Sequence, residues 1–202
     1  MTKPLILASG SPRRQEILNL LGASYDIQPA NIDETPGDGE LAEEYVRRMA
    51  HEKALNVAAA HASQEHIAVL AADTTVVVDG DVLGKPVDRL DGLAMLARLS
   101  GRIHQVMTAV CLVSDTDTES ICVATDVEFV TLSRATCEAY LSTDEPWDKA
   151  GGYGIQGLAG AFVKAIRGSY SNVVGLPMAE TQALLVEAGI ATKLGGEASQ
   201  DY

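Results

Sequence analysis

The chain has 202 residues, a length typical of one domain with a sizeable core. Its apolar content of 47% and charged content of 21% are close to globular averages and argue against a disordered or fibrous chain. The formal net charge of −13 disfavours nucleic acids and membrane surfaces, so we expect neither partner. An anionic small molecule would need a local group of basic side chains, drawn from only 15 Lys and Arg.

The cysteine pattern and the lack of a recognisable export signal in the sequence indicate a reducing compartment. The three cysteines, Cys111, Cys122 and Cys137, form no CxxC pair and are odd in number, so we interpret them as reduced core residues. The apolar stretch near the N-terminus is too short for a secretory signal, and no run of 18 apolar residues occurs. We therefore expect a cytoplasmic protein.

The first third of the chain reads as strand, helix, strand and helix. Residues 5–8 are an apolar run that ends in a Ser-Gly-Ser-Pro turn, and leucines at helical spacing follow until Gly22. Ser11 is predicted to be the N-cap of this helix. Residues 24–28 are expected to form a second strand. Residues 40–61 are rich in Ala, Leu, Glu, Arg and Met and give the clearest helix in the chain.

The middle of the chain predicts a long antiparallel pair of strands. Residues 67–78 are an apolar run interrupted by Asp73, and they read as a buried strand that runs into a hairpin. A helix fits residues 90–99. Residues 104–113 and 120–132, rich in Val, Thr and Cys, flank an acidic turn and should pair with each other.

The last third begins with a short helix at residues 133–142, capped by Ser133, and a glycine-rich loop at residues 151–160. A strand at residues 161–166 and a final helix at residues 177–189 follow.

Because strands and helices alternate before a long hairpin appears, we predict an α/β fold with a mixed twisted sheet and flanking helices. One domain should span residues 1–190, and the small polar tail at 191–202 should be disordered.

The turn at residues 9–14, Ser-Gly-Ser-Pro-Arg-Arg, is the first candidate site. A strand that enters a helix through a tight turn exposes backbone N–H groups, which bind anions. Ser9 lies in this turn, and Arg13 and Arg14 add guanidinium groups that match phosphate oxygens. An ordinary capped helix with two solvated arginines is the alternative. The sequence has no GxxxxGK followed by Ser or Thr, which disfavours a P-loop protein.

Asp73 is the second candidate, because it breaks an apolar run at what would be the carboxyl end of a strand, where ligands bind in open α/β sheets. A carboxylate there needs a metal, a cation or several hydrogen bonds. Asp33 and Glu34 lie in a polar loop, and either could complete a hard-metal site with Asp73. Turn residues are the alternative for all three acids.

Two lysines and a loop complete the candidates. Lys53 lies on the apolar face of the helix at residues 40–61, where a snorkelling stem is the alternative to a functional role. Lys85 is equally ambiguous in a Gly-Lys-Pro turn. The loop at residues 149–157 has glycine at four positions, so its backbone can approach a ligand closely. Tyr153 could stack there and Gln156 could offer its amide to a base, unless this is a flexible surface loop.

Eight short motifs occur in a fixed order: LILASGSPRR, NIDE, EKA, AADT, GKP, SG, HQVMT and DKAGGYGIQG. Together they resemble the Maf family of nucleotide pyrophosphatases over residues 4–190. The SPRR motif with the GGYGIQG-type loop resembles the branch that acts on dTTP and UTP rather than the branch that acts on 7-methyl-GTP.

The resemblance implies a fold related to inosine triphosphate pyrophosphatases, with two lobes around a cleft. It also implies site roles. Asp73 would be the proton acceptor. The specificity positions would be Arg13, Thr74 and Gln156. The acidic and basic residues of the cleft would be Glu34, Lys53 and Lys85.

We therefore expect a nucleoside triphosphate pyrophosphatase with a small-molecule nucleotide as its partner. Mg²⁺ or Mn²⁺, held by Asp73 and Glu34, would assist water in attacking the α-phosphorus. Two alternatives are a purine or 7-methyl-GTP pyrophosphatase of the same fold and a nucleotide-binding regulator without turnover. The sequence leaves open the preferred metal, whether Asp73 acts as base, metal ligand or both, and whether two copies form a homodimer.

Overall fold

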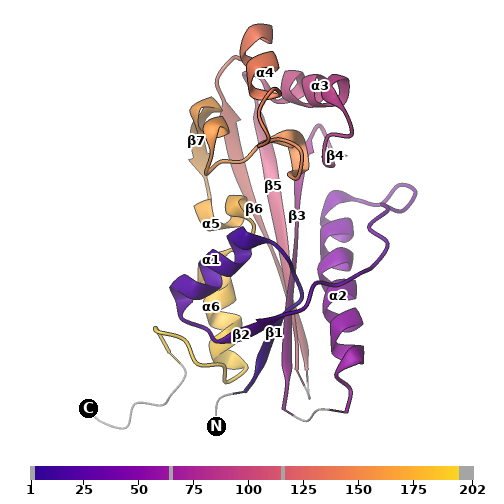
Figure 1. Cartoon of the computed structure of the whole chain (residues 1–202), viewed down its shortest axis with the longest axis vertical. Helices are drawn as coiled ribbons and strands as arrows, with labels where there is room; N and C mark the ends of the chain where they lie inside the picture. Colours follow the sequence, from indigo (N-terminus) through magenta and orange to yellow (C-terminus); the bar gives the residue numbers. More distant parts are fainter. Residues whose placement is uncertain (1–2, 64–65, 115–116, 196–202) are drawn as a thin grey trace.

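The computed structural model describes residues 3–63, 66–114 and 117–195 (Figure 1). In chain order the elements are β1 (Leu5–Leu7), α1 (Pro12–Leu21), β2 (Tyr25–Ile27), α2 (Ala42–Ala60), β3 (Ala68–Val78), β4 (Asp81–Leu83), α3 (Arg89–Leu99), β5 (Ile103–Val113), β6 (Thr118–Phe129), α4 (Arg134–Tyr140), the 3₁₀ helices η1 (Ala150–Gly152) and η2 (Leu158–Phe162), β7 (Val163–Arg167), α5 (Tyr170–Val174) and α6 (Met178–Glu187).

These strands belong to one mixed sheet in the order β2-β1-β3-β5-β6-β7, with β4 paired to the end of β3. β1 is parallel to β2 and to β3, whereas the other pairs are antiparallel. The short strands β1 and β2 are thus joined by the crossover helix α1. The long strands β3, β5 and β6 lie next to each other and run along the length of the molecule (Figure 1). The predicted mixed α/β sheet with flanking helices is confirmed.

In the lower half of the molecule, α1 and α6 cover one face of the sheet and α2 covers the other face. In the upper half, the helices beside the sheet are α3 and α4 (Figure 1). Leu70 and Ala72 of β3 belong to the core with α1 and α6, whereas Val69 and Ala71 belong to the core with α2. This alternation is the two-residue period of a strand. A third core surrounds Phe129 in the upper half. The two halves correspond to the predicted lobes, and the long strands run through both.

The edge of β3 is open between these halves. β1 pairs with β3 only up to Leu70, and β4 begins to pair at Val76. Among the described residues, positions 71–75 therefore have a strand partner on one side only, which is β5. Asp73 lies in the middle of this open stretch. The prediction that Asp73 marks the carboxyl end of a strand is wrong, because β3 continues through it, although it does lie beyond the carboxyl end of β1.

Four further details differ from the sequence prediction. The short helix α5 was not expected, and the glycine-rich loop contains η1 and part of η2. Ser11 is at the N-cap of α1, but its side chain makes no capping hydrogen bond. Of the cysteines, Cys111 and Cys137 are buried as predicted, whereas Cys122 is half-buried.

The first part of the C-terminal segment contacts the end of α1. Residues 191–195 form a turn in which the Lys193 N–H donates to the Leu21 carbonyl at 2.7 Å. The end of α1 therefore gives these residues a hydrogen-bonding partner. Residues 196–202, the rest of the tail predicted to be disordered, lie outside the described residues.

Candidate active site

A cleft of about 960 Å³ opens beside the free edge of β3, between the two halves of the sheet. Eight of the candidate residues from the sequence line it: Ser9, Arg13, Glu34, Lys53, Asp73, Thr74, Lys85 and Gln156. Asp33, the other acid of the polar loop, is not among the lining residues, and its carboxylate accepts hydrogen bonds from Thr35 instead. These side chains come from distant segments of the chain. The fold thus gathers the basic and acidic residues into one place, although the net charge of the whole chain is strongly negative.

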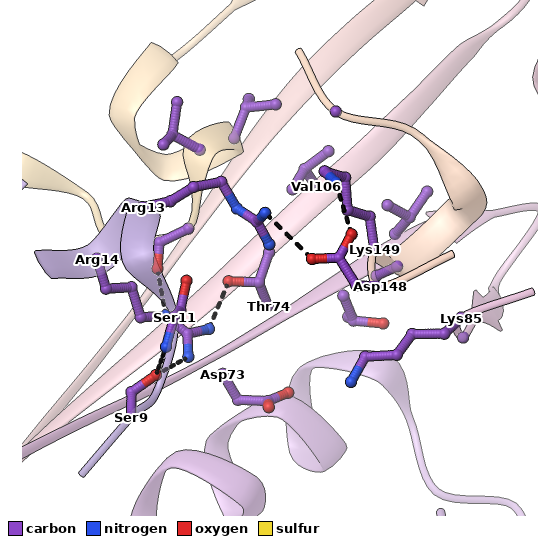
Figure 2. A pocket seen from close by; sticks show the side chains of 18 of the residues that line it. Ser9, Ser11, Arg13, Arg14, Asp73, Thr74, Lys85, Val106, Asp148 and Lys149 are labelled. Carbon is purple, nitrogen blue, oxygen red and sulfur yellow. Dashed lines mark hydrogen bonds and ion pairs between the residues drawn. The ribbon is translucent and has the colours of Figure 1, made fainter. Parts of the chain in front are cut away.

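Arg14 organises the turn that follows β1 (Figure 2). Its guanidinium donates to Ser9 Oγ at 2.9 Å, to Thr74 Oγ1 at 3.2 Å and to the Gly175 carbonyl at 2.9 Å. Burial lowers the pKa of this guanidinium, and nearby Asp73 opposes that effect; an arginine nevertheless stays charged in a protein. One fixed cation therefore joins the β1–α1 turn, β3 and the segment after α5.

Arg13 faces the opposite wall of the cleft. Its Nη1 lies 3.6 Å from Asp148 Oδ2, and Asp148 Oδ1 accepts a hydrogen bond from Lys149 Nζ at 2.5 Å (Figure 2). Partial burial raises the pKa of Asp148, but the hydrogen bond and charge of Lys149, with the charge of Arg13, outweigh it and lower the pKa. The ion pair links α1 in the lower half to the loop before η1 in the upper half.

Lys53 lies between two carboxylates. Its Nζ is 2.7 Å from Asp73 Oδ1 and 2.8 Å from Glu34 Oε1. Lys53 is 9% exposed and Asp73 8%, whereas half of the Glu34 side chain is exposed. Burial opposes ionisation of Glu34, but the hydrogen bond and charge of Lys53, together with Lys85 and Arg14, lower its pKa. The predicted inward orientation of Lys53 is confirmed.

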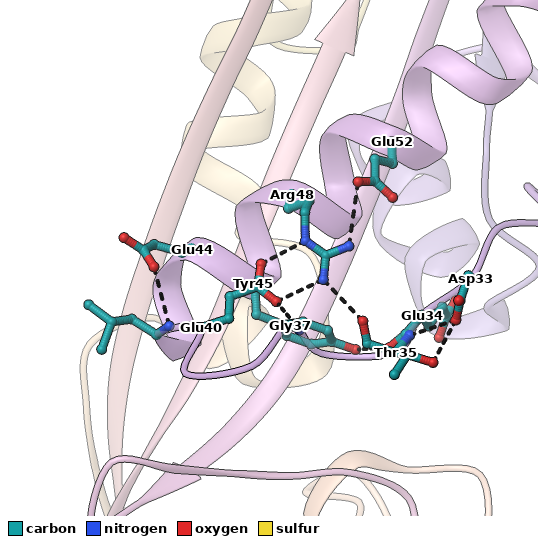
Figure 3. A network of polar contacts seen from close by, with 10 residues as sticks. Asp33, Glu34, Thr35, Gly37, Glu40, Glu44, Tyr45, Arg48 and Glu52 are labelled. Carbon is teal, nitrogen blue, oxygen red and sulfur yellow. Dashed lines mark hydrogen bonds and ion pairs between the residues drawn. The ribbon is translucent and has the colours of Figure 1, made fainter.

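The loop that carries Glu34 is held against α2 by a polar network (Figure 3). Arg48 donates to both oxygens of Glu40 at 2.6 and 2.7 Å and to the Thr35 carbonyl at 3.2 Å. These hydrogen bonds lower the pKa of Glu40 to about 2. The Tyr45 hydroxyl donates to the Glu34 carbonyl at 3.0 Å. The exposed carboxylate of Glu34 is therefore attached to a backbone that α2 fixes.

Thr74 projects from the face of β3 opposite to Asp73, because neighbouring residues of a strand alternate. Its Oγ1 lies 3.0 Å from Thr108 Oγ1, and Thr108 donates to the Asn172 carbonyl at 2.9 Å. This chain of hydrogen bonds connects β3, β5 and α5. The open edge of β3 thus presents a carboxylate to one side and a hydroxyl to the other.

The upper wall of the cleft is the glycine-rich loop. Tyr153 is buried, and its hydroxyl lies 2.8 Å from His104 Nε2. Burial lowers the pKa of His104 to about 4 and raises that of Tyr153, so both are neutral near pH 7. The Gly151 N–H donates to the Gly84 carbonyl at 2.9 Å, next to Lys85. Tyr153 therefore packs in the core and holds the loop in place. Because its ring is buried, the ring is not exposed for the stacking on a base that the sequence had suggested.

The two adjacent arginines have different surroundings. Arg13 stays a prediction as a specificity position, and Arg14 is the one bonded to three segments of the cleft. Asp148 and Glu145 also line the cleft, and neither was selected from the sequence. The repeated Arg and the DKAGG motif were the available signals.

The described residues contain no group of three or more His, Cys, Asp and Glu side chains that could hold a metal ion. Within the same ranges, no helix is both long and apolar enough to cross a membrane.

The protein thus has a mixed α/β fold with a cleft at the open edge of β3. Basic side chains from several segments surround Asp73 in this cleft. The model of the Maf-like protein family matches residues 4–188, and the chain belongs to this family.

Relatives are similar over nearly the whole chain. The dTTP/UTP pyrophosphatase of Hahella chejuensis is 52% identical over 186 residues, which are 92% of this chain and 92% of the relative. The dTTP/UTP pyrophosphatase of Shewanella sp. (strain MR-7) is 51% identical over 191 residues, 92% of this chain and 98% of the relative. A solved structure of the Staphylococcus aureus Ham1 protein is 18% identical, covers 63% of this chain and 72% of its own, and has a TM-score of 0.43.

Proposed function

We propose that this chain hydrolyses dTTP and UTP to the nucleoside monophosphate and pyrophosphate. The observation that carries the proposal is the convergence of Arg14, Lys53 and Lys85 on the cleft that contains Asp73. A triphosphate needs several fixed cations, and a nearby carboxylate can accept the proton of an attacking water. The names of relatives that are about 50% identical over nearly their full length support the same activity.

In the proposed reaction, the water oxygen bonds to the α-phosphorus while the bond from that phosphorus to the bridging oxygen breaks. Pyrophosphate leaves, and the proton of the water passes to the carboxylate of Asp73. Arg13 and Arg14 would bind phosphate oxygens at the start of α1, with Ser9 orienting Arg14. Lys85 would neutralise charge on the leaving pyrophosphate from the other wall.

Two carboxylates in the cleft suit a hard divalent cation, because Mg²⁺ is usually bound by one or two carboxylates together with substrate phosphates and water. Asp73 and Glu34 fit this donor set, since both contact the same Lys53 nitrogen and so lie close together. When bound, Mg²⁺ or Mn²⁺ would polarise phosphate oxygens. Lys53, which contacts both carboxylates, would keep them close to each other.

Two other functions compete with this proposal. A regulator that binds nucleotide without turnover would gain nothing from Asp73 and Glu34, because negative charge weakens phosphate binding. A purine or 7-methyl-GTP pyrophosphatase would share the phosphate site and differ at the loop around Gln156. Incubation with UTP, dTTP, CTP, GTP, ATP and 7-methyl-GTP separates the three. The proposal expects UTP and dTTP to be turned over fastest; binding without products, or a purine preference, would reject it.

Chelation should stop the reaction. With EDTA in excess over all metal, we expect UTP hydrolysis to fall to the background rate, because the phosphates and the carboxylates then repel each other without a bridging cation. Addition of excess Mg²⁺ or Mn²⁺ should restore the rate, which a pyrophosphate assay measures. Turnover that continues unchanged in EDTA would remove the metal from the proposal.

Gln156 should determine the preference for uracil and thymine. Its amide can donate to O4 and accept from N3–H, whereas cytosine reverses that edge. We expect Gln156→Ala to lower kcat/KM for UTP and dTTP by roughly tenfold to a hundredfold, with a smaller loss for CTP. Gln105→Ala, an exposed change on β5 outside the cleft, is the matched control. If the ratios among these substrates stay unchanged in Gln156→Ala, the base is read elsewhere.

A further inference from the structure

Glu145 lies in the segment between α4 and η1, and its carboxylate accepts three hydrogen bonds. Oε2 accepts from the Leu158 N–H at 2.8 Å, and Oε1 accepts from the Ala159 N–H at 3.2 Å. The hydroxyl of buried Tyr140 also donates to Oε1, at 3.0 Å. Leu158 and Ala159 are the first residues of η2, where helical N–H groups lack partners within the helix.

The glycine-rich loop fits closely around this side chain. A Cβ at Gly157 would overlap with the carboxylate of Glu145, and a Cβ at Gly154 would lie 2.7 Å from Cε of Lys149. Lack of space beside the Glu145 carboxylate is thus one reason for glycine at position 157. Lys149 in turn donates to the Glu145 carbonyl at 2.6 Å. The loop is thus built against Glu145.

This arrangement sets the position of Gln156. Within the described part of the chain, the Gln156 amide has no hydrogen-bonding partner, and its side chain is exposed in the cleft. Its place must therefore come from the backbone on either side. On one side the backbone is anchored by buried Tyr153, and on the other by the hydrogen bonds of Leu158 and Ala159 to Glu145.

We propose that Glu145 is a positioning residue for base recognition, which holds the backbone after Gln156 so that its amide meets the edge of the base. The inference rests on the proposed function and extends it to a residue with no role in the phosphate chemistry. Both oxygens of Glu145 accept hydrogen bonds from the chain, which assigns the carboxylate a role in holding the loop. Its contribution is to selectivity and to KM.

Three variants test the positioning role. Glu145→Ala removes all three acceptor contacts. Glu145→Gln keeps one oxygen but turns an NH₂ toward one of the N–H donors, so it should lie between Glu145→Ala and the wild type. Gly157→Ala leaves Glu145 in place and displaces its carboxylate by the added methyl group. Glu138→Ala on α4, which removes an exposed ion pair with Arg134, is the matched control.

We expect Glu145→Ala to raise KM for UTP by about tenfold with kcat changed less than about threefold, because an amide displaced by an ångström loses its hydrogen bonds to the base. The ratio of kcat/KM between UTP and CTP should fall in parallel. Gly157→Ala should give the same pattern. The double variant should be no worse than Glu145→Ala alone, because the methyl group added at position 157 then has room. Glu138→Ala should match the wild type.

Amide hydrogen exchange of Leu158 and Ala159 gives a readout that does not depend on activity. We expect exchange at both amides to become at least about tenfold faster in Glu145→Ala, while amides of β5 keep their protection. A lower kcat at unchanged KM and unchanged UTP/CTP ratio would mean a purely structural role and would overturn the inference. So would unchanged exchange at Leu158. Failure of the wild type to hydrolyse UTP would instead reject the proposed function, whereas the exchange result would still test the anchor.

Discussion

Replacement of Asp73 by Asn is expected to lower kcat for UTP by roughly 10²-fold or more, which is the usual effect of removing a general base. The amide keeps the shape of the side chain but loses the charge and the basicity. The amide oxygen of the variant can still accept the hydrogen bond that Lys53 Nζ now donates to Asp73 at 2.7 Å, and Glu34 remains as the carboxylate partner of that lysine. The fold should therefore survive.

The matched control for this prediction is Asp126→Asn. Asp126 is also an aspartate on a long strand, and its carboxylate accepts one hydrogen bond, from Gln105, outside the cleft. Circular dichroism and thermal unfolding should give native values for both variants, and only Asp73→Asn should lose turnover. A folded Asp73→Asn variant with nearly normal kcat would mean that Asp73 has a structural role alone.

Arg14→Lys is expected to lower kcat/KM for UTP by about 10²-fold, although it conserves the charge. A lysine cannot reproduce the planar fork that reaches Ser9, Thr74 and the Gly175 carbonyl together. A fully buried acceptor left without its donor lowers the free energy of unfolding by about 1–3 kcal/mol, and these partly buried acceptors should each cost less. The melting temperature should therefore fall together with the activity.

Arg13→Lys provides the comparison, because the two arginines are neighbours in the chain with different surroundings. Arg13 is 31% exposed and has a single ion pair, 3.6 Å long, with Asp148. We expect Arg13→Lys to unfold at the wild-type temperature and to lose less activity than Arg14→Lys. Equal melting temperatures for the two variants would contradict the role given to Arg14 as the link between three segments.

Much of the fold could be predicted from local patterns. The Ser-Gly-Ser-Pro turn, Gly22 and the apolar leucines define α1, and the helix-forming composition of residues 40–61 defines α2. Five-residue α5 escaped prediction because it is too short to show helical periodicity. Asp73 suggested a strand end because an acid inside an apolar run is rare, whereas in the fold its charge is compensated by Lys53 from another element.

Sequence patterns selected residues that line the cleft, but they did not indicate which of these residues contact each other. Glu34, Lys53 and Asp73 lie in a loop, a helix and a strand, so nothing local indicates that one ammonium contacts both carboxylates. Arg13 and Arg14 are adjacent on a helix and point about 100° apart. Which of them faces β3 depends on how α1 is rotated against the sheet, and that rotation is set by the packing of distant residues.

The most direct test of the proposed reaction is hydrolysis of UTP in water enriched in oxygen-18, with Mg²⁺ present and mass spectrometry of both products. Attack of water on the α-phosphorus predicts uridine monophosphate that carries one oxygen-18 and pyrophosphate that carries none. Label in the pyrophosphate would mean attack on the β-phosphorus. Uridine diphosphate with orthophosphate as the products would contradict the proposed pyrophosphatase reaction itself.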